Sequence, residues 1–279
     1  MAKKIVKLNG GLGNQMFQYA FACALKEKTE AQILFDFSYF DEITQDENVV
    51  IRPFGLDVFN ADCQKASKED LAKIIYSKPN KNIITQKSAY TFDKKLFNTD
   101  KYYYNGYFQN EEYFKGVREK LIKDFSLREP IDEKNQNILD KILQTNSVSI
   151  HVRRGDYVTL ESASNFHGTC TLKYYEKAIK HIVKQIKNHH FFLFSDDIDW
   201  VIENLKIEYP YTVVDFNQEK GWLDLNLMKH CKHNILANSS FSWWGAWLNE
   251  NPKKIVIAPK KWIASKEKCD IVPQNWKKL

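Results

Sequence analysis

Two adjacent arginines near the middle of the chain are the residues whose type and position most strongly indicate chemistry. Arg153 and Arg154 directly follow an apolar run at residues 148–152, which predicts a strand. Because neighbouring side chains of an extended strand point to opposite faces, one guanidinium can enter a site while the other binds local carboxylates such as Asp156. A guanidinium binds a diphosphate through two parallel hydrogen bonds. The pair therefore indicates a diphosphate site, with a surface salt-bridge cluster as the alternative.

Acidic residues follow the next predicted strand, at residues 191–194. Ser195, Asp196 and Asp197 stand directly after it. Paired carboxylates accept hydrogen bonds from N–H groups such as those on a purine edge. A helix N-cap formed by Ser195 or Asp196 explains the same residues equally well. Asp197 and Asp199 also form a D-x-D triplet, which in other enzymes binds a metal–nucleotide pair, so a metal-dependent site stays open as an alternative.

A serine-rich turn leads into a tryptophan-rich helix between residues 238 and 247. Hydroxyl groups and the N–H groups of a helix N-terminus together form an anion site. Three serines, Ser239, Ser240 and Ser242, can cap the helix and still point hydroxyls at a phosphate. The helix contains Trp243, Trp244 and Trp247. These rings either pack in the core or line a platform for a sugar, and core packing is the favoured interpretation.

A glycine-rich loop near the N-terminus also suits a phosphate. The sequence GGLGNQ starts at Gly10, between a predicted strand at 5–8 and a predicted helix at 15–28. Its N–H groups and the helix dipole can bind an anion. Met16 stands where a dinucleotide motif has its third glycine, and no P-loop lysine follows. Asp36, after the next strand, has the position of a ribose-binding acid. A tight turn needs the same glycines, so both interpretations stay open.

The predicted elements place these motifs on loops at strand ends. From residue 147 onward strands and helices alternate regularly, which predicts a doubly wound parallel sheet whose ligands bind at the carboxyl ends of its strands. The chain begins with a strand, the glycine turn, a helix and a second strand, which is the βαβ signature. Residues 38–112 carry no sustained apolar period. The whole chain is therefore predicted to be α/β, with a domain boundary near residues 126–146.

The composition is that of a folded protein with a basic C-terminal segment. The 279 residues are enough for two domains, and 43% hydrophobic with 27% charged residues excludes disordered, collagen-like and coiled-coil classes. The net charge is +6, and the eight lysines from Lys253 onward account for this excess. Because the excess is local, a general nucleic-acid surface is disfavoured. The segment is either solvated or in contact with an anionic membrane surface.

The cysteines and the apolar segments favour a cytoplasmic location. Five scattered cysteines, without a CxxC pair or zinc spacing, are typical of reduced cytosolic thiols. Polar residues at 9–15 interrupt the apolar region that a signal peptide would need. No run of about 18 apolar residues exists. We therefore expect a cytoplasmic protein, with contact to the inner face of the membrane through the lysine-rich C-terminus left open.

Taken together, the motifs resemble those of the bacterial α-1,2-fucosyltransferases of glycosyltransferase family 11. The resemblance rests on four stretches in the same order, at residues 10–19, 151–157, 195–197 and 238–244. It implies a GT-B fold, with two Rossmann-like domains and a cleft between them. The expected domains are an acceptor-side domain at 1–140 and a GDP-fucose-binding domain at 141–279.

The resemblance also implies a reaction. L-fucose would pass from GDP-β-L-fucose, with inversion and without a metal or other cofactor, to the 2-hydroxyl of a terminal β-galactose. The acceptor would be an oligosaccharide or a lipid-linked glycan, as in O-antigen lipopolysaccharide. Three alternatives stay open: a metal-dependent transferase using Asp197 and Asp199, a nicotinamide-binding oxidoreductase built on the glycine loop, and a non-catalytic glycan-binding module favoured by the 14% aromatic content.

Residue roles follow from the same resemblance. Arg153 is expected to bind the β-phosphate, and His151 with Asp196 or Asp197 to face the guanine. Further donor contacts are expected from Asn14, Ser239 and Ser240. Glu161 is the first candidate for the catalytic base, because related α-1,6-fucosyltransferases carry a glutamate ten residues after the motif histidine. Members of the α-1,2 family do not all keep it, so Asp156 is the second candidate.

Overall fold

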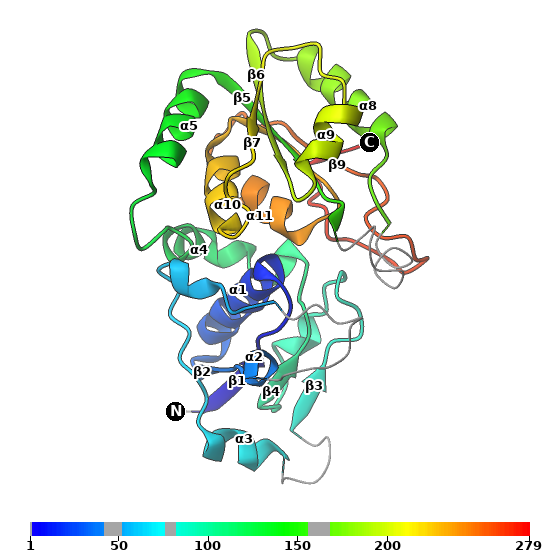
Figure 1. Cartoon of the computed structure of the whole chain (residues 1–279). Coiled ribbons are helices and arrows are strands. Elements are labelled where there is room, and N and C mark those ends of the chain that lie inside the picture. Colours follow the sequence, from blue (N-terminus) through cyan, green and yellow to red (C-terminus); the bar gives the residue numbers. More distant parts are fainter. Residues whose placement is uncertain (1, 42–51, 76–81, 156–167) are drawn as a thin grey trace. The chain divides into compact units, whose positions relative to one another are not determined.

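The chain forms two compact units (Figure 1). The computed structural model describes residues 2–41, 52–75, 82–155 and 168–279. The first unit comprises Met1–Glu129 with Lys268–Pro273, and the second comprises Pro130–Glu267 with Gln274–Leu279. The units divide between residues 129 and 130, within the predicted range of 126–146. A division between residues 140 and 141 would cut the helix α5 (Glu133–Gln144). This helix belongs to the second unit because Ile142 packs into the core of that unit.

The first unit contains a parallel sheet in the order β2-β1-β4-β3. Its strands are β1 (Lys3–Lys7), β2 (Gln32–Asp36), β3 (Ile83–Thr85) and β4 (Tyr103–Asn105). Its helices are α1 (Leu12–Thr29), α2 (Ser38–Asp41), α3 (Lys68–Ile75) and α4 (Arg118–Asp124). Short 3-10 turns lie at Leu56–Val58, Lys94–Leu96, Glu111–Tyr113 and Lys115–Val117. The predicted βαβ start is confirmed by β1, α1 and β2.

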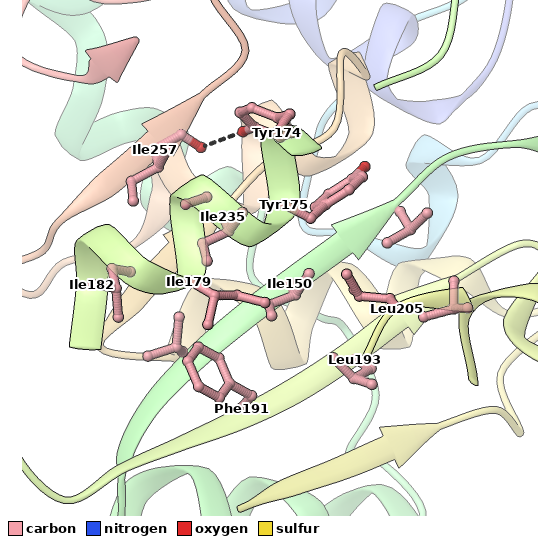
Figure 2. Packing of buried hydrophobic residues seen from close by; sticks show 14 residues of the cluster. Ile150, Tyr174, Tyr175, Ile179, Ile182, Phe191, Leu193, Leu205, Ile235 and Ile257 are labelled. Atoms are coloured by element: carbon pink, nitrogen blue, oxygen red, sulfur yellow. Dashed lines mark hydrogen bonds between the residues drawn. The ribbon is translucent and has the colours of Figure 1, made fainter. Parts of the chain in front are cut away.

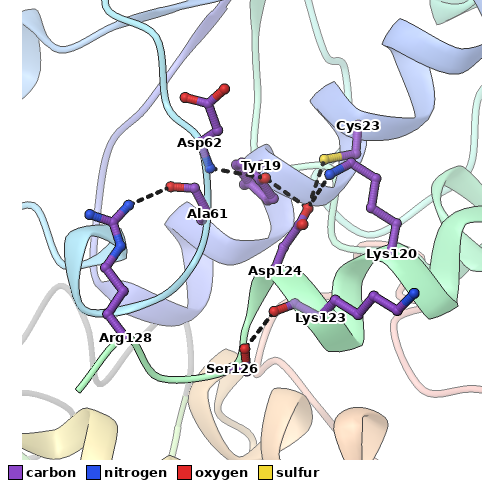
Figure 3. A network of polar contacts seen from close by, with 9 residues as sticks. All are labelled: Tyr19, Cys23, Ala61, Asp62, Lys120, Lys123, Asp124, Ser126 and Arg128. Carbon is purple, nitrogen blue, oxygen red and sulfur yellow. Dashed lines mark hydrogen bonds and ion pairs between the residues drawn. The ribbon is translucent and has the colours of Figure 1, made fainter.

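A polar network ties the carboxyl end of α4 to α1 (Figure 3). Asp124 accepts hydrogen bonds from Tyr19 Oη at 2.8 Å and from Lys120 Nζ at 2.6 Å. Just beyond α4, the guanidinium of Arg128 donates to two carbonyl oxygens in the segment 59–61. These contacts hold α1, α4 and that segment together where the sequence carries no regular apolar period.

The second unit contains a parallel sheet in the order β10-β9-β8-β5-β6-β7. Its strands are β5 (Asn146–Val152), β6 (His189–Ser195), β7 (Tyr211–Val214), β8 (His233–Ile235), β9 (Val256–Ala258) and β10 (Lys277–Lys278). Besides α5, its helices are α8 (Leu172–Val183), α9 (Ile198–Asn204), α10 (Gly221–His230) and α11 (Ser240–Leu248). The predicted alternation of strands and helices around a parallel sheet is confirmed.

Helices cover both faces of this second sheet. Phe191 and Leu193 of β6 pack on the side of α8 (Figure 2). Phe192 and Phe194 point to the other side, where they meet α5 and α10. The side chains alternate in this way because successive residues of a strand point to opposite faces. Burial of each phenylalanine ring contributes about 1.5–3 kcal/mol to the stability of the fold. A strand buried on both faces is fixed in position, so the loop at its carboxyl end is fixed as well.

The C-terminal segment contributes side chains to the core. Trp262 and Trp276 are buried, and the ring of Trp276 lies 5.5 Å from that of Trp243. These tryptophans are therefore not exposed beside the lysines as membrane anchors would be, which supports the solvated interpretation of the segment. Within the described residues, the structure has no helix that is both long and apolar enough to span a bilayer. All five cysteines are free thiols.

Candidate active site

The two arginines of the sequence motif lie at the carboxyl end of β5, beside the end of β6. Strand pairing places Val152 opposite Ser195, so the residues that follow each strand are neighbours. Arg153 Nη1 lies 2.9 Å from Asp196 Oδ2. The other carboxylate oxygen, Asp196 Oδ1, accepts a hydrogen bond from the backbone N–H of Arg154 at 2.9 Å. Asp196 thus fixes both the guanidinium of Arg153 and the backbone beside it.

The second guanidinium is held on α9. Arg154 Nε donates to Asp197 Oδ2 at 3.0 Å, and its guanidinium carbon lies 3.6 Å from the ring centroid of Trp200. One arginine was expected to bind a local carboxylate such as Asp156, and the structure provides Asp197 for that role. Both acids of the pair are thus engaged by arginines, and their assignment to guanine stays a prediction. Asp156 lies outside the described residues.

Gly155 leaves the space that Asp196 needs. A Cβ atom at this position would overlap Asp196 Oδ2. A larger residue would therefore push the carboxylate away from Arg153. The glycine of the motif serves this close approach, which the sequence alone did not reveal.

His151 is a neutral, buried group with an unsatisfied ring nitrogen. It is 5% exposed, and its ring lies 5.6 Å from that of Phe241. Burial, reinforced by the charge of Arg153, lowers the pKa of His151 to about 3. Nδ1 has no hydrogen-bond partner among the residues that the structure describes. A buried polar atom without a partner costs free energy, so this imidazole is held in place at the expense of stability.

The serine-rich turn caps α11. Ser239 accepts a hydrogen bond from the N–H of Phe241 at 3.3 Å, while Ser240 is partly exposed. The neighbouring Asn238 is structural, because its amide donates to the carbonyl oxygens of Gly168 and Trp262. The predicted core position of the three tryptophans is confirmed, since each is at most 4% exposed. Ser240 is therefore the partly exposed hydroxyl at the start of a helix whose tryptophans are buried.

The N-terminal glycine loop lies in the first unit. Gly10 adopts the left-handed conformation, with φ of 73°, that the tight turn requires. Asn14 Oδ1 accepts a hydrogen bond from Gln109 Nε2 at 2.7 Å. The Asp36 carboxylate accepts hydrogen bonds from Tyr103 Oη at 2.6 Å and from the N–H of Ser38 at 2.9 Å, so it stabilises the backbone at the end of β2. These contacts favour the tight-turn interpretation of the loop.

The predicted site residues are thus only partly brought together. His151, Arg153, Asp196 and Asp197 form one cluster at the ends of β5 and β6. Asn14 belongs to the other compact unit. Glu161, like Asp156, lies outside the described residues. Among the residues that the structure covers, no three His, Cys, Asp or Glu side chains are grouped as a metal site would require.

Comparisons with known proteins identify the family. The family model for glycosyl transferase family 11 matches residues 2–279. The chain belongs to this family. It is 34% identical to the O-antigen biosynthesis glycosyltransferase WbnK of Escherichia coli, over 96% of this chain and 98% of that protein. It is also 34% identical to an alpha-1,2-colitosyltransferase of Escherichia coli, over 100% and 99% of the two chains.

More distant matches agree with this assignment. Galactoside alpha-(1,2)-fucosyltransferase 1 of Rattus norvegicus is 27% identical over 49% of this chain and 39% of its own length. Among solved structures, the FUT1 protein of Arabidopsis thaliana in complex with GDP superposes with a TM-score of 0.51 at 10% identity. It covers 94% of this chain and 72% of that one. The expected GT-B fold is confirmed.

The structure adds a half-buried acid, Asp224, that the sequence did not reveal. It lies in the first turn of α10 and accepts a hydrogen bond from Asn217 Nδ2 at 2.8 Å. Burial raises the pKa of Asp224 to about 7. The available signal was an acid between Leu223 and Leu225 in the first, otherwise apolar half of the helix. The start of α10 is near the motif residues, because Gly221 faces the ring of Phe241.

Replacing Asp224 by asparagine is expected to change the pH dependence of stability. The folded pKa is raised above that of the unfolded chain, so the wild type loses stability as pH rises from about 4 to about 7. The new amide would keep an oxygen for Asn217 but would carry no charge to bury. A difference of about three pKa units, at about 1.36 kcal/mol per unit, means that Asp224→Asn should be more stable than the wild type by roughly 4 kcal/mol at pH 8 and by almost nothing at pH 4.

Urea unfolding at both pH values measures this difference. Glu203→Gln, at an exposed position on α9, is the matched control and should keep the wild type's loss of stability between pH 4 and pH 8. An Asp224→Asn variant with the same pH profile as the wild type would show that this carboxyl is not the titrating group.

Proposed function

We propose that this family 11 glycosyltransferase moves L-fucose from GDP-β-L-fucose to the 2-hydroxyl of a terminal β-galactose, forming an α-1,2 linkage. The observation that carries the proposal is the Arg153–Asp196 pair, fixed at the carboxyl ends of two parallel strands. The galactoside alpha-(1,2)-fucosyltransferase of the rat supports the donor sugar and the acceptor. The Escherichia coli relatives support a glycan of the O-antigen type and offer colitose as a second donor sugar.

The proposed reaction requires that the departing diphosphate be stabilised. As the bond between the sugar C1 and the β-phosphate oxygen breaks, negative charge grows on GDP and positive charge on the sugar. Arg153 is the group we assign to the β-phosphate, because a preorganised guanidinium stabilises this charge without reorienting. Ser239 and Ser240 at the start of α11 are assigned to the same diphosphate.

His151 is assigned to the nucleotide base. Its low pKa keeps the imidazole neutral at pH 7, with one ring nitrogen able to donate and the other to accept. The assignment to guanine rests on the motif that contains His151, since Nδ1 itself is closed to solvent in this structure. Asn14 stays a proposed donor contact from the first unit, and no metal or other cofactor is proposed for the reaction.

A carboxylate is proposed to take the proton of the acceptor hydroxyl as that oxygen bonds to C1 with inversion. Glu161 is the first candidate and Asp156 the second. Glu161→Gln is expected to lower kcat by about 10³-fold with an unchanged Kd for GDP, because general-base catalysis contributes about 10²–10⁴-fold. Turnover numbers and GDP titrations of Glu161→Gln and Asp156→Asn compare the two. Wild-type turnover in Glu161→Gln would exclude Glu161 as the catalytic base and leave Asp156 as the candidate.

The proposed reaction is tested with purified protein, lactose and GDP-fucose in EDTA, with a colitosyl donor in parallel. Mass spectrometry and linkage NMR should identify fucose α-1,2-linked to galactose. Product from the colitosyl donor alone would overturn the choice of fucose and keep the transferase. A titration of GDP followed by intrinsic tryptophan fluorescence tests the alternative of a non-catalytic glycan-binding module, because such a module is not expected to bind GDP. Neither product nor GDP binding would refute the transferase function.

The proposed setting of the reaction is the cytoplasm, where a nucleotide sugar and a lipid-linked glycan meet at the inner face of the membrane. Lysines 260, 261, 277 and 278 are exposed, and with the neighbouring tryptophans buried we propose that this segment is solvated.

A further inference from the structure

The sheet of the second unit changes its direction of winding between β5 and β8. From β5 the chain continues to β6 and β7 on one side and then returns to β8 and β9 on the other, so this is the topological switch point. The register of β5 with β8 ends at Ile150 opposite Ile235, whereas that with β6 continues to Val152 opposite Ser195. Ligands of such sheets bind outside the carboxyl ends of the strands at the switch point.

The residues that we assign to the sugar nucleotide come from both sides of this point. His151 and Arg153 lie at the end of β5, and Ser239 and Ser240 follow β8. The ring of Phe241, next to these serines, lies 5.6 Å from the ring of His151. A nucleotide that contacts both sides therefore requires the end of β5 and the turn after β8 to keep a fixed spacing.

Two neighbouring tyrosines of α8 reach both sides. The Tyr175 hydroxyl donates to the carbonyl oxygen of His151 at 3.2 Å. The Tyr174 hydroxyl donates to the carbonyl oxygen of Leu236 at 2.7 Å, and the carbonyl oxygen of Ile257 lies 3.2 Å away as a second acceptor (Figure 2). Successive residues of a helix are about 100° apart, so adjacent side chains reach different strands. One turn of helix thus holds the backbone at the carboxyl ends of β5, β8 and β9.

The first turn of α8 is itself held in place. The helix begins at Leu172, and the side chain of its N-cap residue, Thr171, accepts a hydrogen bond from the N–H of Tyr174 at 3.3 Å. Directly before it, the thiol of Cys170 donates to Asn238 Oδ1 at 3.5 Å, beside the serine-rich turn. The two tyrosines are therefore carried by a capped helix end that also contacts this turn.

Packing alone does not account for the two hydroxyl groups. Tyr174 is 8% and Tyr175 1% exposed, and burial raises the pKa of both phenols, so they stay protonated and donate. Farther along the same helix, Ala178, Ile179 and Ile182 pack on the sheet without any polar side-chain atom (Figure 2). Phenylalanine would fill the same space at both tyrosine positions. The hydroxyls therefore serve the contacts with backbone carbonyl groups at the strand ends.

We propose that Tyr174 and Tyr175 are positioning residues that set the spacing of the donor-binding residues across the switch point. Tyr175 acts through the backbone of His151, two residues before Arg153. Tyr174 acts through the backbone of Leu236, from which the serine-rich turn continues. The inference rests on the proposed function, since it takes these residues to bind the sugar nucleotide.

The test uses Tyr174→Phe and Tyr175→Phe, each of which removes one oxygen atom and keeps the ring. Each variant should raise the Kd for GDP about fivefold and lower kcat by a similar factor, which is the size of the net contribution of one hydrogen bond. The KM for lactose should not change. Tyr209→Phe is the matched control, because this ring belongs to the same core but packs on His189 at the amino end of β6. It should match the wild type.

Melting temperatures and a double variant separate positioning from a structural role. Tyrosines with a structural role alone would lower the melting temperature on substitution and leave the Kd for GDP and kcat unchanged, and this result would overturn the proposal. In an Arg153→Ala background, Tyr175→Phe should weaken GDP binding less than in the wild type, whereas Tyr174→Phe should keep its full effect. Equal effects of both variants in the two backgrounds would contradict the assigned route through Arg153.

Amide hydrogen exchange decides the positioning even if the proposed function fails. Tyr175→Phe should speed exchange in residues 151–154 and Tyr174→Phe in residues 236–240, while Tyr209→Phe should change neither. A wild type that neither binds GDP nor transfers sugar would refute the proposed function. In that case this local pattern of exchange supports the role of the tyrosines at the strand ends, and unchanged exchange overturns it. If one variant fails to fold, the other decides.

Discussion

Arg153→Ala is expected to lower kcat by at least about 10³-fold with the fold intact. Removing a single preorganised donor from a developing oxyanion costs about 10²–10³-fold, and a guanidinium on a phosphoryl group contributes more. Arg153→Lys should also lose most activity, because an ammonium cannot make two parallel hydrogen bonds. Turnover with GDP-fucose and lactose measures both losses. Melting temperature should change little, since the guanidinium is partly exposed and its ion pair contributes only modestly to stability.

Nucleotide affinities provide the control for Arg153. The assigned contact is the β-phosphate, which GDP has and GMP lacks. Arg153→Ala should therefore weaken GDP binding while leaving GMP binding close to that of the wild type. A variant that keeps its turnover within tenfold of the wild type, or that loses GMP as strongly as GDP, would contradict the assigned role.

Asp196→Asn is expected to lower kcat by about 10–100-fold, because it removes the anion that orients Arg153. Asparagine can still accept from the N–H of Arg154, but it no longer holds the guanidinium by charge. Gly155→Ala should give a similar loss by a different route, since the new methyl group would displace the Asp196 carboxylate. Asp197→Asn affects Arg154 only and should lower kcat by less than tenfold.

A double-mutant cycle distinguishes positioning from a separate catalytic role. If Asp196 acts only through Arg153, Asp196→Asn should have no further effect on turnover in an Arg153→Ala background. Additive losses would show that Asp196 contributes independently, for example by contacting guanine. Urea unfolding of each single variant serves to separate either result from loss of fold.

The sequence predicted the second unit well because its signals are local. Apolar runs such as residues 191–194, separated by helical patterns, indicate strands that are buried in a parallel sheet. The motifs of this unit follow such runs, which places them at the carboxyl ends of strands. The tryptophan-rich helix was predicted as core for the same reason, since three large apolar rings within one turn-and-a-half need burial.

The exact residue of the domain boundary and the structure of the first unit were harder to predict. The boundary lies before α5 because Ile142 packs into the second unit, and a helical pattern does not say which core receives it. Residues 38–112 form short strands, short helices and 3-10 turns, whose order depends on buried hydrogen bonds such as those of Gln15 and Gln18. Bonds between residues far apart in the chain leave no period in the sequence.

The amino-acid sequence by itself determined the α/β class, the family motifs and the residue types that suit a diphosphate. Only the tertiary structure decided which carboxylate each arginine receives, that Gly155 makes room for Asp196, and that His151 is neutral with an unsatisfied nitrogen. Residue type and strand period are encoded locally, whereas ion pairing, steric exclusion and desolvation depend on atoms that folding brings from distant positions.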